Sequence, residues 1–123
     1  MRNPIPIETT PPVAEGAWGG TDRLIDLPTG ETALWVVVVA ALAADVYTTA
    51  LGLQAGLVEG NPAMRWAIAQ GGFAALALAK VAALGLGGLL RAVRPQYRLV
   101  VPLGLAVPWL ATVAVNAVTL ATL

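Results

Sequence analysis

Histidine and cysteine are absent from the 123 residues of this chain, and only 11% of the residues are charged. Without histidine the chain lacks the usual general base and the commonest transition-metal ligand, and without cysteine it lacks disulfides and thiolate sites. Soluble domains carry about 25% charged residues. Because 58% of the residues are hydrophobic, the composition predicts an integral membrane protein in contact with the lipid bilayer.

The few charges are unevenly spread, although the formal net charge is zero. Acidic residues crowd the front of the chain, and arginines cluster late. No basic run has the size that nucleic-acid binding requires. We therefore expect no nucleic-acid partner, and the residue content points to no cofactor.

The first 31 residues differ in composition from the rest. Five of the nine prolines lie there, at positions 4, 6, 11, 12 and 28, and large aliphatic side chains are few. Such a segment buries too little apolar surface to offset the entropy lost on ordering. We expect a disordered tail over 1–31, followed by a helical membrane domain over 32–123.

Three stretches of that domain are suited to crossing a bilayer, which takes about 20 mainly apolar residues. They cover about 32–57, 72–93 and 99–123. Asn61 followed by Pro62 is a typical helix start, so a short interfacial helix is expected over 62–70. The Gly71-Gly72 pair predicts a break between this helix and the second span. The predicted fold class is all-α, with three transmembrane helices, this interfacial helix and the tail.

The arginines predict the orientation of these spans. Arg91, Arg94 and Arg98 lie in the turn between the second and third spans, whereas no other connection has more than Arg65. By the positive-inside rule the arginine-rich turn is cytoplasmic. The N-terminus would then lie inside and the C-terminus outside the cell membrane.

Polar residues recur along one face of the first span. If the helix continued to residue 59, residues at offsets 0, 3, 4, 7, 11 and 14 would share that face. Lipid offers such side chains no partners, so the face must meet protein or water. The glycines alone would be explained by close helix packing, but the carboxylate at mid-span would not. These residues are Asp45, Thr48, Thr49, Gly52, Gly56 and Glu59.

The second span has one charged residue of its own, Lys80, at a depth similar to that of Asp45. Each charge alone at the bilayer centre costs about 2.5–3.5 kcal/mol on the insertion scale. Because antiparallel neighbours place the two residues at one level, we expect Asp45 and Lys80 to form an ion pair. A ridge of small residues would let the first span approach: Ala75, Ala79, Ala83 and Gly87.

A second polar cluster is expected nearer the outer end, formed by Glu59, Asn61 and Asn116. Asn116 shares a face of the third span with Thr112 and Thr119. Simpler explanations also hold for two of these residues. Asn61 can be only a helix cap, and Asn116 can make only one interhelical hydrogen bond, worth about 0.6 kcal/mol.

The series from Asp45 and Thr48 through Glu59, Asn61 and Pro62 to Lys80 resembles a known family. It is an uncharacterised domain-of-unknown-function family of small archaeal and bacterial multi-span membrane proteins. The resemblance runs from about Leu34 to the end of the chain, and Glu-Gly-Asn-Pro is its most specific element. It implies a site at the same residues, and no activity comes with it.

Two functions fit these observations. Asp45, Thr48, Thr49 and Lys80 could couple protons or cations, which requires a homo-oligomer because three helices are too few to enclose a pathway. Alternatively, the chain is a structural accessory subunit of a larger membrane protein. An enzyme is disfavoured, because Asp45 and Glu59 would stand about 21 Å apart on one helix, and Lys80 argues against a metal at Asp45.

Overall fold

The computed structural model describes residues 29–123, and most of the predicted tail lies outside this range. Within it the chain forms three long helices, α2 (Thr29–Gln54), α3 (Pro62–Val93) and α4 (Val100–Ala121), with a 3-10 turn, η1 (Pro95–Tyr97), before α4. The all-α prediction is confirmed, and each of the three helical segments is long and apolar enough to cross a membrane. The first helix begins at Thr29, within the range predicted to be tail.

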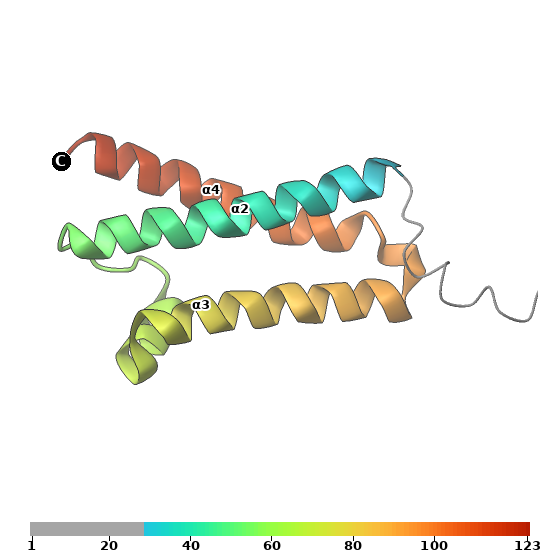
Figure 1. Cartoon of the computed structure of the whole chain (residues 1–123), viewed down its shortest axis with the longest axis horizontal. Coiled ribbons are helices and arrows are strands. Elements are labelled where there is room, and N and C mark those ends of the chain that lie inside the picture. Colours follow the sequence, from blue (N-terminus) through green and yellow to red (C-terminus); the bar gives the residue numbers. More distant parts are fainter. Residues whose placement is uncertain (1–28) are drawn as a thin grey trace, which may run out of the picture.

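The three helices run antiparallel in chain order, so α2 and α4 point the same way (Figure 1). α2 packs closely along α4, whereas α3 approaches α2 at far fewer places. A small apolar core lies between them, with Val38, Leu42, Leu76 and Ala106 all buried. The contact between α2 and α4 is the most extensive one between the described helices.

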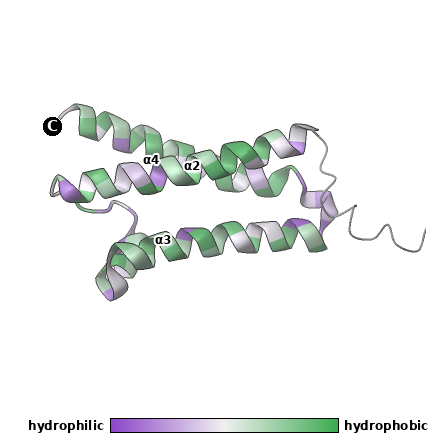
Figure 2. Ribbon diagram, in the orientation of Figure 1, coloured by the Kyte–Doolittle hydropathy of each residue, from purple (hydrophilic) through white to green (hydrophobic). Residues whose placement is uncertain are grey.

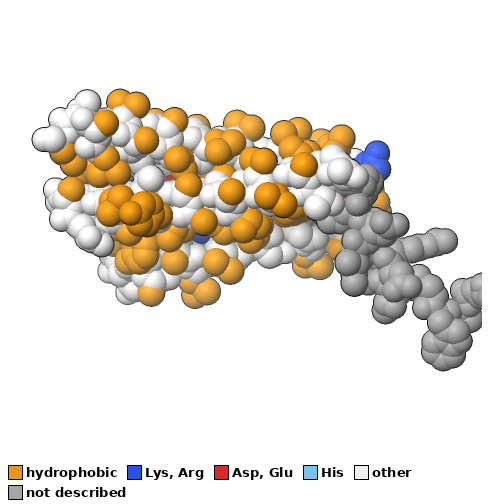
Figure 3. All heavy atoms as spheres, turned by 45° about the horizontal axis from the view of Figure 1, so that its top comes forward, with side chains coloured by type: hydrophobic (Ala, Val, Ile, Leu, Met, Phe, Trp, Pro, Cys, Tyr) orange, Lys and Arg blue, Asp and Glu red, His pale blue; other side chains and the backbone are white. Residues whose placement is uncertain are grey.

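The outer surface of the bundle is apolar. Figure 2 shows hydrophobic residues along most of each helix, and Figure 3 shows hydrophobic side chains spread over the length of one face. Large aliphatic side chains such as Val36, Leu78, Leu86 and Val107 are more than half exposed. In water such a surface would aggregate, so this exposure fits helices that face lipid.

Gly56 ends α2 earlier than predicted. Its φ is +83°, a left-handed conformation that glycine adopts without steric cost. The Gly56 N–H donates to the Leu53 carbonyl at 3.1 Å and the Leu57 N–H donates to the Gly52 carbonyl at 2.9 Å, which is the Schellman pattern. The predicted helix through residue 57 is therefore wrong, and the polar face of α2 stops at Gly52.

A kink divides α3 where the sequence predicted a break. Asn61 caps the first turn, with its Oδ1 accepting the Ala63 N–H at 3.0 Å. Gly71 (φ −143°, ψ 20°) and Gly72 (φ 67°, ψ −162°) then leave the helical conformation. The short helix before the kink and the long one after it correspond to the predicted interfacial helix and second span.

Replacing Gly72 by alanine should lower the free energy of unfolding by about 1–3 kcal/mol, because this region of φ and ψ is essentially restricted to glycine. Gly85 provides a matched control in the same helix, since a Cβ added there meets no atom within 4 Å. Gly85→Ala should be neutral or stabilising by up to about 1 kcal/mol. SDS titration of both variants in bicelles measures the difference, and equal effects would contradict the assigned kink.

Candidate functional site

The Asp45 carboxylate and the Lys80 ammonium form an ion pair between α2 and α3. Lys80 Nζ donates to Asp45 Oδ2, as the similar depth of the two residues predicted. Asp45 is 0% exposed and Lys80 is 7% exposed. A pair this deeply buried bridges two helices that otherwise touch at few places.

Hydroxyl and amide groups extend this pair toward α4. Thr49 Oγ1 donates to Asp45 Oδ1 at 3.4 Å, one helical turn away. Asn116 Nδ2 of α4 donates to Thr49 Oγ1 at 3.2 Å and to Thr48 Oγ1 at 3.0 Å. Thr48 Oγ1 in turn donates to the Asp45 backbone carbonyl at 3.3 Å. All three helices therefore contribute to one connected polar group, which we call the polar site: Asp45, Thr48, Thr49, Lys80 and Asn116.

The predicted outer cluster is divided in the structure. Asn116 hydrogen-bonds to the two threonines of α2 rather than to Glu59 or Asn61. Glu59 and Asn61 belong to the loop after α2, where Glu59 Oε1 accepts the Asn61 backbone N–H at 2.9 Å. Because α2 ends at Gln54, Glu59 lies off the helix that was expected to carry it.

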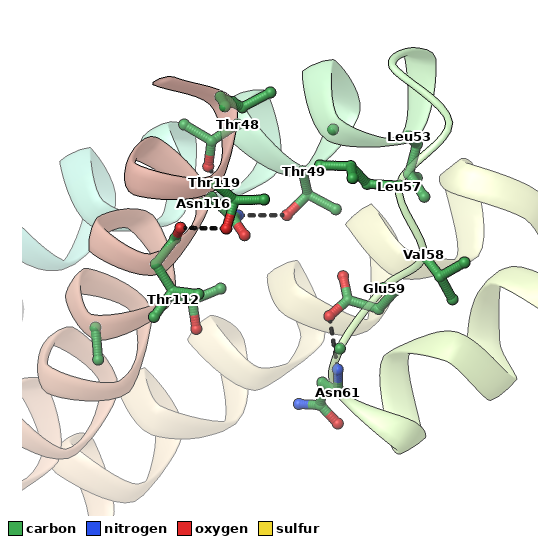
Figure 4. A pocket seen from close by; sticks show the side chains of 15 residues that line it. Thr48, Thr49, Leu53, Leu57, Val58, Glu59, Asn61, Thr112, Asn116 and Thr119 are labelled. Atoms are coloured by element: carbon green, nitrogen blue, oxygen red, sulfur yellow. Dashed lines mark hydrogen bonds between the residues drawn. The ribbon is translucent and has the colours of Figure 1, made fainter. Parts of the chain in front are cut away.

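The two groups nevertheless face one hollow, which we call the loop pocket (Figure 4). It has a volume of about 430 Å³ and lies between the end of α2, the loop over 57–61 and the second half of α4. Thr48, Thr49 and Asn116 line one wall and Glu59 and Asn61 another. The Asp45–Lys80 pair is thus one hydrogen bond away from a pocket wall, through Thr49.

A second ion pair escaped the sequence analysis, in which Glu31 was counted with the acidic front end. Arg91 Nε donates to Glu31 Oε1 at 2.5 Å and Arg91 Nη2 donates to Glu31 Oε2 at 3.1 Å. Glu31 is only 1% exposed. The depth argument used for Asp45 would have found it, because Glu31 begins the first span where Arg91 ends the second.

The ridge expected beside Lys80 serves a different neighbour at its far end. A Cβ added to Gly87 would come within 2.7 Å of Leu105 Cδ1 and 3.3 Å of Val101 Cγ1, both on α4. Gly87 therefore allows α3 to approach α4 rather than α2. The backbones of α3 and α2 do not pack closely at this level, and the long Lys80 side chain spans the distance between them.

Fold and site together define an integral membrane protein in which residues 29–123 form three long helices, with a buried ion pair that adjoins a polar pocket. The chain belongs to the DUF5658 family, described as a domain of unknown function, whose sequence model matches residues 36–122. The expected membership of a domain-of-unknown-function family is thereby confirmed. No curated protein and no solved structure matches the chain.

Proposed function

We propose that the protein binds protons or small cations at its buried polar site and couples this binding to a change in helix arrangement. It would work in the cytoplasmic membrane as a homo-oligomer. The observation that carries the proposal is the Asp45–Lys80 pair, buried within the spans and joined through Thr49 to the wall of the loop pocket. Ionisable residues inside a membrane are costly and are most often retained for ion or proton pathways.

The geometry supports competition between Lys80 and a proton or cation for the Asp45 carboxylate. A proton or cation that reached Asp45 through the loop pocket would compete with the Lys80 ammonium for the same oxygens. Thr49 lies between the pocket and Asp45, and its hydroxyl can accept and donate a proton. Release of Lys80 would loosen α3 from α2 while α2 stays packed on α4, so the ligand would favour one of two helix arrangements.

Two features of the chain support the proposed assembly and orientation. Three helices do not enclose a pathway, so a route past Asp45 requires further copies of the chain. Arg91, Arg94 and Arg98 lie at the end of the bundle where α3 passes into η1 and α4, and the positive-inside rule assigns that end to the cytoplasm. The loop pocket would then open toward the outside.

Asp45→Asn should abolish flux, lowering it at least about tenfold, since amide for carboxylate removes the charge that holds a proton or cation. The measurement uses purified protein in liposomes with a pH- or cation-sensitive dye inside. Tyr97→Phe, an exposed change in η1 at the opposite end, is the matched control and should keep wild-type flux. Equal flux in Asp45→Asn, or no flux in the wild type, refutes the coupling role.

An accessory subunit is the second candidate, and an apolar groove between α2 and α3 favours it. The groove has a volume of about 540 Å³ and is walled by side chains such as Leu42, Val46, Phe73 and Val81. A helix of a larger membrane protein could lie there. Native mass measurement separates the candidates, because a homo-oligomer supports coupling and a stoichiometric foreign membrane subunit supports the accessory role.

A further inference from the structure

Among residues 29–123, Glu59 is the single charged group that lines the loop pocket. The polar lining from this part of the chain consists of threonine hydroxyls, two asparagine amides and the Glu59 carboxylate, with no lysine or arginine. The remaining lining is mostly apolar, with Leu53 and Leu57 on one side and Val115 and Leu120 on the other. A molecule that fits this lining has a polar, positively charged end and an apolar body.

Glu59 is available to such a molecule. The residue is half-buried, and the Asn61 N–H occupies its Oε1. Within residues 29–123 no lysine or arginine pairs with Glu59, since the two ion pairs of this part of the chain use Asp45 and Glu31. Figure 4 shows the Glu59 carboxylate on the loop, facing the space that Thr112 and Asn116 border from α4.

The pocket lining offers more hydrogen-bond acceptors than its own donors occupy. An ammonium group has three N–H donors and no acceptor, and threonine hydroxyls together with the carboxylate can accept all three. An anion would meet the Glu59 charge with no cation in the lining to compensate for it. A pocket of this volume is within the range that encloses drug-sized molecules, about 300–1,000 Å³.

We propose that the loop pocket binds amphipathic primary amines, with the ammonium on Glu59 and the apolar body against Leu53, Leu57, Val115 and Leu120. The proposal deepens the coupling function by naming the class of ligand for the loop pocket that adjoins the polar site. Transport of the amine rests on that function, whereas binding of the amine does not. A neutral polar ligand and a purely structural Glu59 are the competing explanations.

The test compares three probes that share one skeleton: 4-phenylbutylamine, 4-phenylbutanol and 4-phenylbutyrate. Calorimetric titration into full-length protein in nanodiscs, corrected with empty nanodiscs, should show the amine binding about tenfold or more tightly than the alcohol, as a charge-assisted hydrogen bond provides. The acid should not bind. Similar affinity for amine and alcohol in the wild type overturns the proposal in favour of a neutral ligand.

Glu59→Gln should reduce amine binding to the level of the alcohol while leaving alcohol binding unchanged. Glutamine keeps an oxygen for the Asn61 N–H, so the start of α3 is preserved. Glu59→Asp, which keeps the charge, should retain part of the amine preference and serves as a second variant should the glutamine form not fold. An unchanged amine preference in Glu59→Gln would overturn the proposal and mean that Glu59 serves only to accept the Asn61 N–H.

Failure of this inference and failure of the coupling role are distinguishable. Amine binding is measured on the wild type and Glu59→Gln without any gradient, whereas flux is measured on the wild type and Asp45→Asn. If binding depends on Glu59 while flux is independent of Asp45, the amine site stands and coupling is refuted. If flux depends on Asp45 while the probes show no charge preference, coupling stands and the amine site is refuted.

Discussion

Lys80→Met should lower the free energy of unfolding by about 3 kcal/mol, because it leaves the buried Asp45 carboxylate without its cation. Asp45 is 0% exposed, so neither lipid headgroups nor water replaces the lost partner in place. Methionine keeps most of the volume of the lysine stem, which limits any packing loss. SDS titration of the purified protein in bicelles measures the change.

The double variant Asp45→Leu with Lys80→Met provides the control for this loss. Removing both charges abolishes the unpaired carboxylate, and buried ion pairs replaced by apolar residues of similar size are often neutral or stabilising. Thr49 can then donate to the carbonyl one turn back, as threonine hydroxyls in helices commonly do. Recovery of most of the lost stability is expected, and a double variant as unstable as Lys80→Met would contradict the pairing.

The same double variant separates the two uses of the ion pair. A pair kept only to hold α2 and α3 in register would be dispensable once both charges are gone. A pair kept for coupling would not, so the stable double variant should carry no flux. Membrane charges retained at a cost in stability are explained by function rather than by folding.

The depth of each polar residue along its span was readable from the sequence. An isolated charge in an apolar run must find a partner at its own level, and only Lys80 was available to Asp45. This reasoning depends on antiparallel neighbours, which follow from short connections, and on the fixed rise of a helix. Depth predicted the ion pair, while apolar length predicted the three helices and the glycine pair predicted the kink at Gly71 and Gly72.

Local backbone conformation was less predictable. Nothing in the alternation of apolar and polar residues reveals that Gly56, rather than Gly52 or Gly60, adopts the left-handed conformation that ends α2. The Schellman hydrogen bonds and the contact of Leu57 with Gly52 decide it. Projecting the helix five residues beyond its end at Gln54 placed Glu59 on the wrong element.

The composition of the N-terminal stretch also led to the wrong assignment of Glu31. It follows a proline-rich, acidic stretch and was assigned to the tail, whereas the helix already begins at Thr29. Glu31 precedes Asp45 by 14 residues and Arg91 follows Lys80 by 11, close to four and three helical turns. Each helix therefore presents both its ion-pairing residues on one face. The two ion pairs connect α2 and α3 at two successive levels, which we call rungs.

Arg91→Met should cost about 2 kcal/mol, less than Lys80→Met, because Arg91 keeps a side-chain exposure of 19% near the end of the bundle. The guanidinium donates to both oxygens of Glu31, a planar fork that an ammonium does not reproduce. Arg91→Lys should therefore recover only part of the loss. Arg94→Met, an exposed arginine outside any ion pair of residues 29–123, should stay within about 0.5 kcal/mol of the wild type. SDS titration orders the three variants, and an Arg91→Met protein as stable as Arg94→Met would show that the second rung contributes nothing to holding α3 against α2.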